Sequence, residues 1–133
     1  MAFEYIDRTR VAWADTDARG RINQTAAFRY AEHAETEAFR TAGIDAPASY
    51  PRRRVEAEFR RAITFNDELE VRLRPDRLGR TSITWVWEIV RGGEVCVEGR
   101  HTVVHVDAVG RPAPLPPEVR VAFGNGESAS APT

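Results

Sequence analysis

The chain has 133 residues, 42% of them hydrophobic and 29% charged, and its formal net charge is -1 at pH 7. This length and apolar content predict a single domain with one core, and the balanced charge gives no reason to expect nucleic acid or an anionic membrane as a partner. The one cysteine, Cys96, excludes an intramolecular disulfide framework and a zinc site built from cysteines. No run approaches about eighteen consecutive apolar residues and no secretory signal pattern opens the chain, so a cytoplasmic location is expected.

The first expected element is a strand that ends in a pair of aspartates. Apolar and polar side chains alternate from Tyr5 to Trp13, as in a strand with one buried face. The alternation stops at Asp15 and Asp17. Aspartates that follow a strand often accept hydrogen bonds from backbone N–H groups, and this is the commoner role for Asp15.

The next expected element is a helix over residues 24–42. Asn23 stands at its N-cap position, and Gly43 followed by Ile44 has the form of a glycine C-terminal cap. The first helical turn carries unpaired N–H groups and a partial positive charge, which suits an oxygen that becomes negative during acyl transfer. The carboxylate of Asp17 lies close to that turn in sequence and is suited to attack or to activate water there. A stripe of mostly small residues would let a sheet pack closely on the helix: Ala27, Tyr30, Ala31, Ala34 and Ala38.

Four more strands are expected after the helix. Alternating apolar residues predict them over about 55–59, 68–74, 83–89 and 95–103, with a tight hairpin at Arg91-Gly92-Gly93-Glu94. A strand, a helix and then four strands is an α+β order. Residues 124–133 have almost no apolar content and predict a disordered C-terminal tail, which leaves one domain over residues 1–123.

The segment around the two aspartates also carries a family resemblance. It reads Trp13-Ala-Asp15-Thr-Asp17-Ala-Arg-Gly20 and is followed by Ile22-Asn23. With further matches at residues 65–69, 79–82 and 110–117, the chain resembles the hotdog-fold thioesterases of the 4-hydroxybenzoyl-CoA thioesterase superfamily from about Phe3 to Phe123. The resemblance implies an α+β hotdog fold, in which a five-stranded antiparallel sheet curls around one long central helix.

The resemblance implies a thioesterase that hydrolyses acyl-CoA or acyl-carrier-protein thioesters. Asp17 takes the place of the family's catalytic carboxylate, acting as nucleophile or as general base, and the backbone N–H of Gln24 that of the oxyanion donor. Preorganised donors of this kind contribute roughly 3 kcal/mol in acyl-transfer enzymes. Asn23 is expected beside the substrate, where it places these N–H groups. Coenzyme A or phosphopantetheine enters as part of the substrate, no separate cofactor is expected, and no spacing of residues predicts a metal site.

Two groups of residues are candidates for binding the rest of the substrate. The only dense basic cluster consists of residues 52–54 with Arg60 and Arg61, and it suits the phosphates of coenzyme A or of a phosphopantetheine arm. Its candidate binding residues are Arg52, Arg53, Arg54 and Arg60. All nineteen cationic residues are arginines, so a solvated strand edge is an equally good reading of the cluster. Tyr50 and Phe59 are candidates for an acyl or aryl pocket, although packing in the core is the commoner fate of such residues.

Several positions depart from the family pattern. Arg21 stands where many relatives have histidine, Gln24 where they have a second asparagine, and Ala27 where they have tyrosine. On the helix, Glu35 stands where relatives have an arginine. Because some hotdog thioesterases carry their carboxylate on the central helix, Glu32 or Glu35 is a second candidate, with a solvated glutamate as the commoner alternative.

Two other classes of function remain open. A hotdog hydratase or dehydratase normally needs a histidine about five residues from the aspartate for proton transfer to carbon, and this chain has Ile22 there. A non-catalytic acyl-thioester-binding protein is permitted by the altered first helical turn.

His101 and His105 alternate along the last strand in step with the apolar Val103, so both are expected to be partly buried. A homodimer or homotetramer is expected, because a curled sheet with one helix leaves strand edges open.

Overall fold

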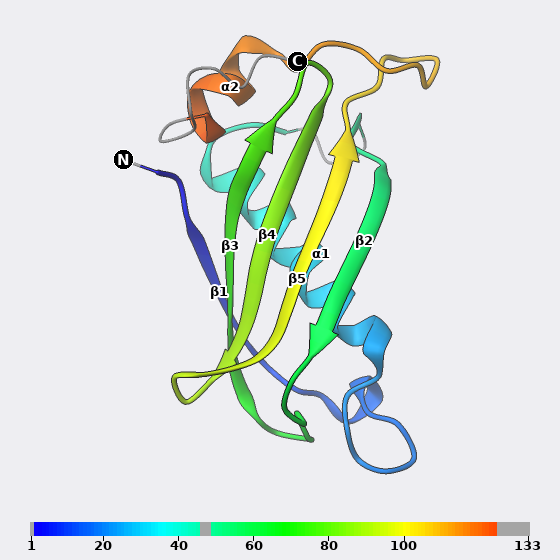
Figure 1. The fold of residues 1–133 in the computed structure, drawn as a ribbon, viewed down its shortest axis with the longest axis vertical. Helices are drawn as coiled ribbons and strands as arrows, with labels where there is room; N and C mark the ends of the chain where they lie inside the picture. The colour runs from blue at the N-terminus through cyan, green and yellow to red at the C-terminus, as the bar shows by residue number, and fades with distance from the viewer. Residues whose placement is uncertain (1, 46–48, 125–133) are drawn as a thin grey trace.

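The computed structural model describes residues 2–45 and 49–124. Within these ranges a five-stranded antiparallel sheet carries the long helix α1 (Gln24–Thr41) on one face, and a short helix, α2 (Pro117–Phe123), lies at one end (Figure 1). In the order β1-β3-β4-β5-β2, the strands β1 and β2 are the two edges of the sheet. The strand bounds are β1 (Tyr5–Arg10), β2 (Arg52–Phe59), β3 (Glu68–Leu78), β4 (Ser82–Arg91) and β5 (Glu94–Val104).

The long helix confirms the prediction closely. It begins where expected and ends one residue early. Its C-terminus is the expected glycine cap, because the N–H of Gly43 (φ 77°) donates to the carbonyl of Arg40 at 3.0 Å and that of Ile44 donates to Phe39 at 2.9 Å. The α+β order and the five strands are likewise confirmed.

The hairpin between β4 and β5 is also where the sequence predicts it. Gly92 (φ 58°) and Gly93 (φ 84°) both lie in the left-handed region, which glycine enters without a Cβ penalty. Two such residues make the turn whose twist matches that of the flanking strands.

The first strand is shorter than predicted. It ends at Arg10, and Trp13–Asp15 forms a 3-10 turn, η1, in which the N–H of Asp15 donates to the carbonyl of Ala12 at 2.9 Å. The apolar alternation continues through Val11, which is buried and whose backbone still exchanges hydrogen bonds with Asn66 and Asp67, although it lies beyond the end of β1. Alternation of apolar and polar residues predicts which side chains are buried, but it does not predict where a strand ends.

Helix α2 is not predicted by the sequence pattern. It has only seven residues, too few to show a helical period, although Val119 and Phe123 on it are both buried. Pro117 at its start suits the first turn of a helix, where no N–H is needed. The expected disordered tail falls, after Gly124, on residues outside the described ranges.

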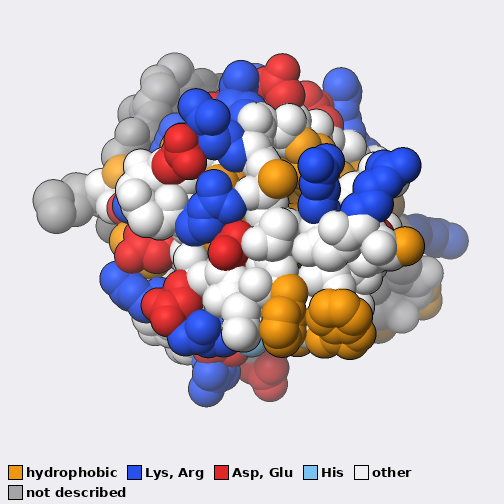
Figure 2. All heavy atoms as spheres, turned by 90° about the horizontal axis from the view of Figure 1, so that it is seen from below, with side chains coloured by type: hydrophobic (Ala, Val, Ile, Leu, Met, Phe, Trp, Pro, Cys, Tyr) orange, Lys and Arg blue, Asp and Glu red, His pale blue; other side chains and the backbone are white. Residues whose placement is uncertain are grey.

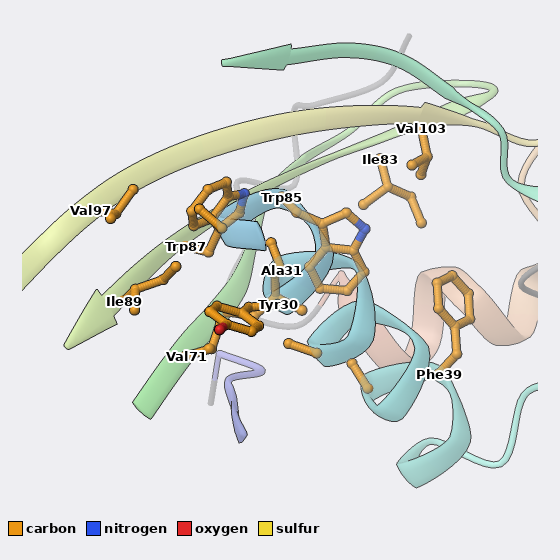
Figure 3. Packing of buried hydrophobic residues seen from close by; sticks show 14 of the residues in the cluster. Tyr30, Ala31, Phe39, Val71, Ile83, Trp85, Trp87, Ile89, Val97 and Val103 are labelled. Atoms are coloured by element: carbon orange, nitrogen blue, oxygen red, sulfur yellow. The ribbon is translucent and has the colours of Figure 1, made fainter. Parts of the chain in front are cut away.

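The core lies between α1 and the inner face of the sheet (Figure 3). Small side chains on α1 let the helix approach the sheet closely. Phe39, near the end of α1, packs against Trp85 and Phe123 with ring centroids 6.2 and 5.1 Å away, so α2 closes one end of the core. Buried inner-face residues include Ile83, Trp85, Trp87 and Ile89 of β4 and Val97 and Val103 of β5.

Candidate active site

Asp17 lies in a tight turn, residues 17–21, shortly before α1. Its Oδ1 accepts hydrogen bonds from the backbone N–H groups of Arg19 at 2.8 Å and Arg21 at 3.2 Å. The N–H of Arg19 contributes most to lowering the pKa of Asp17 below its usual value, so the carboxylate is ionised at neutral pH. The side chain is exposed, and its Oδ2 accepts no hydrogen bond from the part of the chain that the structure describes. One carboxylate oxygen is therefore held by the turn and the other faces solvent.

The start of α1 presents free hydrogen-bond donors. Asn23 occupies the N-cap position, as predicted, but its side chain makes no cap hydrogen bond: Nδ2 donates to the carbonyl of Thr16 at 3.2 Å instead. The backbone N–H groups of Gln24 and Thr25 consequently have no acceptor within residues 2–45 and 49–124, and both residues are exposed. These N–H groups sit at the positive end of the helix dipole.

Asp15 is a buried ion-pair partner of α1. Its Oδ1 accepts from Arg29 Nη2 at 2.6 Å and its Oδ2 from the hydroxyl of Tyr30 at 2.9 Å. Burial by itself would raise the pKa of Asp15, but the bonds from Arg29 and Tyr30 outweigh burial and leave the pKa lowered. The backbone carbonyl of Asp15 also accepts from the N–H of Asn23 at 2.8 Å. Asp15 thus ties the segment before the helix to the first two turns of the helix.

Exposed aromatic rings lie at the same end of the molecule. Trp13 and Phe65 are 69% and 44% exposed, and their rings meet edge to face with centroids 5.4 Å apart. Figure 2, which looks onto this end, shows hydrophobic side chains gathered beside arginine and acidic side chains. The surface around the Asp17 turn is therefore partly apolar and partly charged.

The two aromatic candidates for an acyl pocket are far apart. Tyr50 is buried against Phe39 and His105, with ring centroids 4.9 and 5.0 Å away, and burial raises its pKa to about 12. Phe39 lies fifteen residues beyond Gln24, roughly 22 Å along the helix axis, so Tyr50 belongs to the opposite end of α1. Phe59 ends β2, is 46% exposed and lies at the same end of the molecule as the Asp17 turn (Figure 1).

The predicted basic cluster does not form one concentrated positive site. Three of the four candidates are paired with acids, which lie on α1, on β5 or on β2 itself. Arg53, at an irregularity in the pairing of β2, is exposed and has no ion pair within the described ranges. The pairs are Arg52 with Glu35 (2.8 Å) and Glu32 (3.6 Å), Arg54 with Glu56 (3.3 Å), and Arg60 with Glu58 (2.7 Å) and Glu98 (3.2 Å).

Glu35 is not a solvated helix residue but the centre of a buried polar network. Its Oε1 accepts from Nε2 of His101 at 3.0 Å as well as from Arg52. The indole N–H of Trp87 donates to Nδ1 of His101 at 3.1 Å. Because an indole nitrogen can only donate, His101 is the neutral tautomer with its proton on Nε2. A Cβ on Gly99 would lie 2.0 Å from the Trp87 ring, so the missing side chain at position 99 makes room for this arrangement.

Sequence reasoning singled out members of this network but missed their contact. Glu35 is notable in sequence only as an unusual acid, and His101 only by its parity. The two are 66 residues apart, and nothing local signals that they meet. The inward parity of His101, set beside an acid on the buried face of the helix, is the one clue available.

A hollow of about 630 Å³ lies on the sheet face opposite α1, away from the Asp17 turn. Its charged lining side chains alternate along their strands with those that face the core; they include Glu56, Glu58, Arg72, Arg74, Glu98 and Arg100. Across residues 2–45 and 49–124, no three His, Cys, Asp or Glu side chains group closely enough to hold a metal ion. No helix in those ranges has the length and apolar character needed to cross a bilayer.

Comparison with known protein families identifies the superfamily of this chain. The model of the thioesterase-like superfamily matches residues 11–123, and the chain belongs to this superfamily. It is accordingly a thioester hydrolase, as its resemblance to the 4-hydroxybenzoyl-CoA thioesterase superfamily implies. No functionally curated protein sequence matches it significantly.

Solved structures agree with this membership. A predicted thioesterase from Bacillus stearothermophilus is 26% identical, with a TM-score of 0.84 over 92% of this chain and 96% of that one. A gentisyl-coenzyme A thioesterase is 25% identical, with a TM-score of 0.80 over 89% of this chain and 98% of the other. A 1,4-dihydroxy-2-naphthoyl-CoA thioesterase from Synechocystis shares the fold at 15% identity, with a TM-score of 0.86 over 95% and 99% of the two chains.

The buried network predicts a large stability cost for losing its carboxylate. Glu35→Ala leaves His101 and Arg52 without their shared acceptor and is expected to lower the free energy of unfolding by about 3 kcal/mol. Glu37→Ala on the same helix is the matched control, since the ion pair that Glu37 makes in the described chain is with Arg40 at the surface, and its loss should cost under about 1 kcal/mol. Urea unfolding followed by circular dichroism measures both, and equal costs would contradict the network.

Proposed function

We propose that the protein hydrolyses acyl-CoA thioesters with Asp17 as the catalytic carboxylate and the N–H of Gln24 as the oxyanion donor. The observation that carries this proposal is an ionised, solvent-facing carboxylate in the turn shortly before a helix whose first N–H groups have no acceptor in the described chain. Asn23 supports the arrangement by leaving those N–H groups uncapped. The role of Asn23 beside the substrate is thus positional.

The chemistry follows from this geometry. The thioester carbonyl oxygen accepts from the first N–H groups of α1, which stabilise the negative charge that develops on it, and donors of this kind contribute roughly 3 kcal/mol. The free oxygen of Asp17 adds to the carbonyl carbon, the C–S bond breaks and the thiolate leaves. Water then opens the resulting anhydride and returns Asp17 as a carboxylate with release of the free acid.

A lowered pKa supports the nucleophilic route over general-base catalysis. A general base works best when its pKa lies near the operating pH, whereas the backbone N–H of Arg19 holds the pKa of Asp17 below the usual value for aspartate. A weakly basic carboxylate takes a proton from water poorly but remains fully charged for attack. In the alternative route Asp17 would deprotonate the water that attacks directly.

The substrate proposed is a coenzyme A thioester rather than a carrier-protein thioester. Two of the similar structures are named as coenzyme A thioesterases. Arg53 is exposed without an ion pair in the described ranges, and Arg54 and Arg60 are exposed enough to exchange their surface partners for phosphate. Arg52 is held by Glu35 and is the least available of the four.

We expect the working protein to be a homo-oligomer. The edge strand β2 leaves Val55 and Phe59 exposed at 44% and 46%, on the side of the strand that faces the helix layer. A second copy that paired with this edge would cover those side chains and extend the sheet. Light scattering should give a mass of two or four chains, and the mass of one chain would contradict this expectation.

The chain contains its own control for testing Asp17. Asp107 makes the same turn, in which its Oδ1 accepts from the N–H groups of Val109 and Arg111, both at 3.0 Å. Gly110 (φ 87°) occupies the position that Gly20 (φ 81°) takes in the Asp17 turn. Only the turn at Asp17 lies beside a long helix start. Asparagine at either position keeps an oxygen that can accept the two bonds.

We expect Asp17→Asn to lower thiol release from a panel of acyl-CoA and aroyl-CoA thioesters by roughly a hundredfold or more, because an amide cannot attack or accept the proton. Asp107→Asn should retain wild-type rates. A thiol-specific chromogenic reagent follows the release. If both variants retain activity, Asp17 is not the catalytic carboxylate; if the wild type binds the thioesters without releasing thiol, the protein is a binding module.

The pH dependence of hydrolysis provides a second test. The ionised form of Asp17 is the active one and its pKa is lowered, so kcat/KM should stay level from neutral pH down to about 4 and fall only below that. A rate–pH profile, with circular dichroism at each pH to show that the fold persists, measures this. A rise in kcat/KM centred between pH 6 and 7, by contrast, would indicate a different catalytic group or a base of raised pKa.

A further inference from the structure

We propose that Arg91 and Asp67 are positioning residues for the Asp17 turn. They hold the connection between β2 and β3, residues 60–67, in the place from which its backbone supports the segment before α1. The inference rests on the proposed role of Asp17 and adds to it the residues that set the position of that carboxylate.

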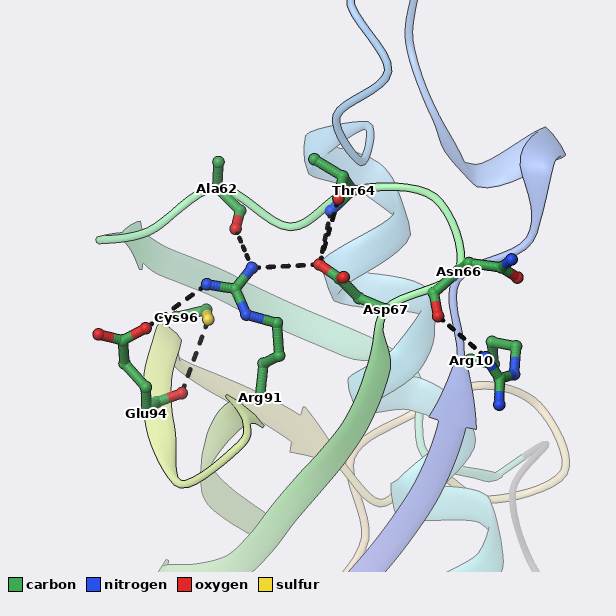
Figure 4. Close-up of polar contacts among 8 residues, drawn as sticks. All are labelled: Arg10, Ala62, Thr64, Asn66, Asp67, Arg91, Glu94 and Cys96. Carbon is green, nitrogen blue, oxygen red and sulfur yellow. Dashed lines mark hydrogen bonds and ion pairs between the residues drawn. The ribbon is translucent and has the colours of Figure 1, made fainter.

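Arg91, the last residue of β4, binds the connection at two points (Figure 4). Its Nη1 donates to the carbonyl of Ala62 at 2.5 Å and to Oδ2 of Asp67 at 3.1 Å. The same Oδ2 accepts from the backbone N–H of Thr64 at 2.9 Å. One guanidinium and one carboxylate therefore close the connection into a compact loop.

The connection is also attached to the hairpin after Arg91. The N–H groups of Arg60 and Arg61 both donate to the carbonyl of Cys96, at 2.8 and 3.1 Å. The Nε of Arg61 pairs with Glu94 at 2.8 Å, and Nη2 of Arg91 reaches the other oxygen of that glutamate at 3.5 Å. The start and the end of the connection thus move with the β4–β5 hairpin.

From the connection, backbone bonds pass directly to the candidate site. The N–H of Ile22 donates to the carbonyl of Ile63 at 2.9 Å, and Arg21 forms an isolated antiparallel bridge with Thr64. Arg21 is the residue whose N–H binds Asp17 Oδ1 and whose carbonyl accepts from the N–H of Asp17 at 2.7 Å. A displacement of residues 63 and 64 therefore displaces the catalytic carboxylate relative to the start of α1.

The ion pair of Arg91 and Asp67, called the clamp from here on, lies outside the core. Its effect on catalysis can therefore be separated from its effect on folding. The side chains of Arg91 and Asp67 are 32% and 23% exposed, and partly exposed ion pairs contribute little to stability. A misplacement of about 1 Å at a reacting group, however, can cost roughly a hundredfold in rate. Loss of the clamp should accordingly show in the turnover number before it shows in unfolding.

The test compares Arg91→Met with Arg100→Met. Arg100 makes a similar ion pair, with Asp76 at 3.0 Å, on the sheet face away from the Asp17 turn. We expect Arg91→Met and Asp67→Ala to lower kcat roughly tenfold or more, with KM within about twofold of wild type. Arg100→Met should leave both constants unchanged, and Arg91→Lys, which keeps the charge and donors, should recover part of kcat. Unfolding midpoints of the two arginine variants should agree.

A readout that needs no activity separates this inference from the proposed function. Amide hydrogen exchange of the peptide covering residues 16–24 should speed up in Arg91→Met and Asp67→Ala, because the Ile22 amide loses its fixed partner, and not in Arg100→Met. If no thioester is hydrolysed by the wild type, the proposed function fails and the exchange result still decides the clamp. Unchanged exchange in Arg91→Met overturns the inference, whether or not kcat falls, and so does faster exchange with an unchanged kcat in an active enzyme.

Discussion

The hydrogen bonds that fasten the segment between β1 and α1 are the interaction on which the candidate site depends. Asp15 is buried against Arg29 and Tyr30 of the helix, and its carbonyl takes the N–H of Asn23, so the segment and the helix start form one unit. The side chain of Asn23 donates to the carbonyl of Thr16 instead of capping the helix, so the first helical N–H groups have no acceptor in the described chain. Donors that are already in place need no reorganisation when charge develops on a substrate oxygen, which is the source of their catalytic value.

Local geometry alone does not make a catalytic carboxylate here. The turns at Asp17 and Asp107 have the same hydrogen bonds and a glycine of nearly the same φ. They differ in their neighbours, because only the first lies shortly before a helix of eighteen residues whose N-cap side chain leaves the first N–H groups uncapped. An 18-residue helix carries a full macrodipole, whereas a turn on its own has none. The proposed chemistry therefore arises from the placement of an ordinary turn.

The arginines of this protein mostly form ion pairs within and between elements of the fold and do not gather into one binding surface. Three arginines of the predicted phosphate cluster pair with acids on α1, on β5 or on β2 itself. Arg91 joins two connections, and Arg52 reaches the buried network of Glu35, His101 and Trp87. The contacts of Arg52 with Glu35, Arg60 with Glu98 and Arg91 with Asp67 join parts of the chain that lie far apart in sequence, so side chains as well as backbone link the sheet and the helix.

Periodicity, glycines and a contiguous motif are local signals, and they are sufficient to predict the α+β order, the glycine cap of α1, the β4–β5 hairpin and the family from the sequence. The sequence also places Asp17 shortly before the helix, because the two are close neighbours along the chain. Three features could not be predicted in this way: Asn23 leaves the helix uncapped, Tyr50 lies at the far end of α1, and Glu35 meets His101. Those outcomes depend on which distant residues come into contact, and side-chain pairing across 66 positions leaves no periodic trace in the chain.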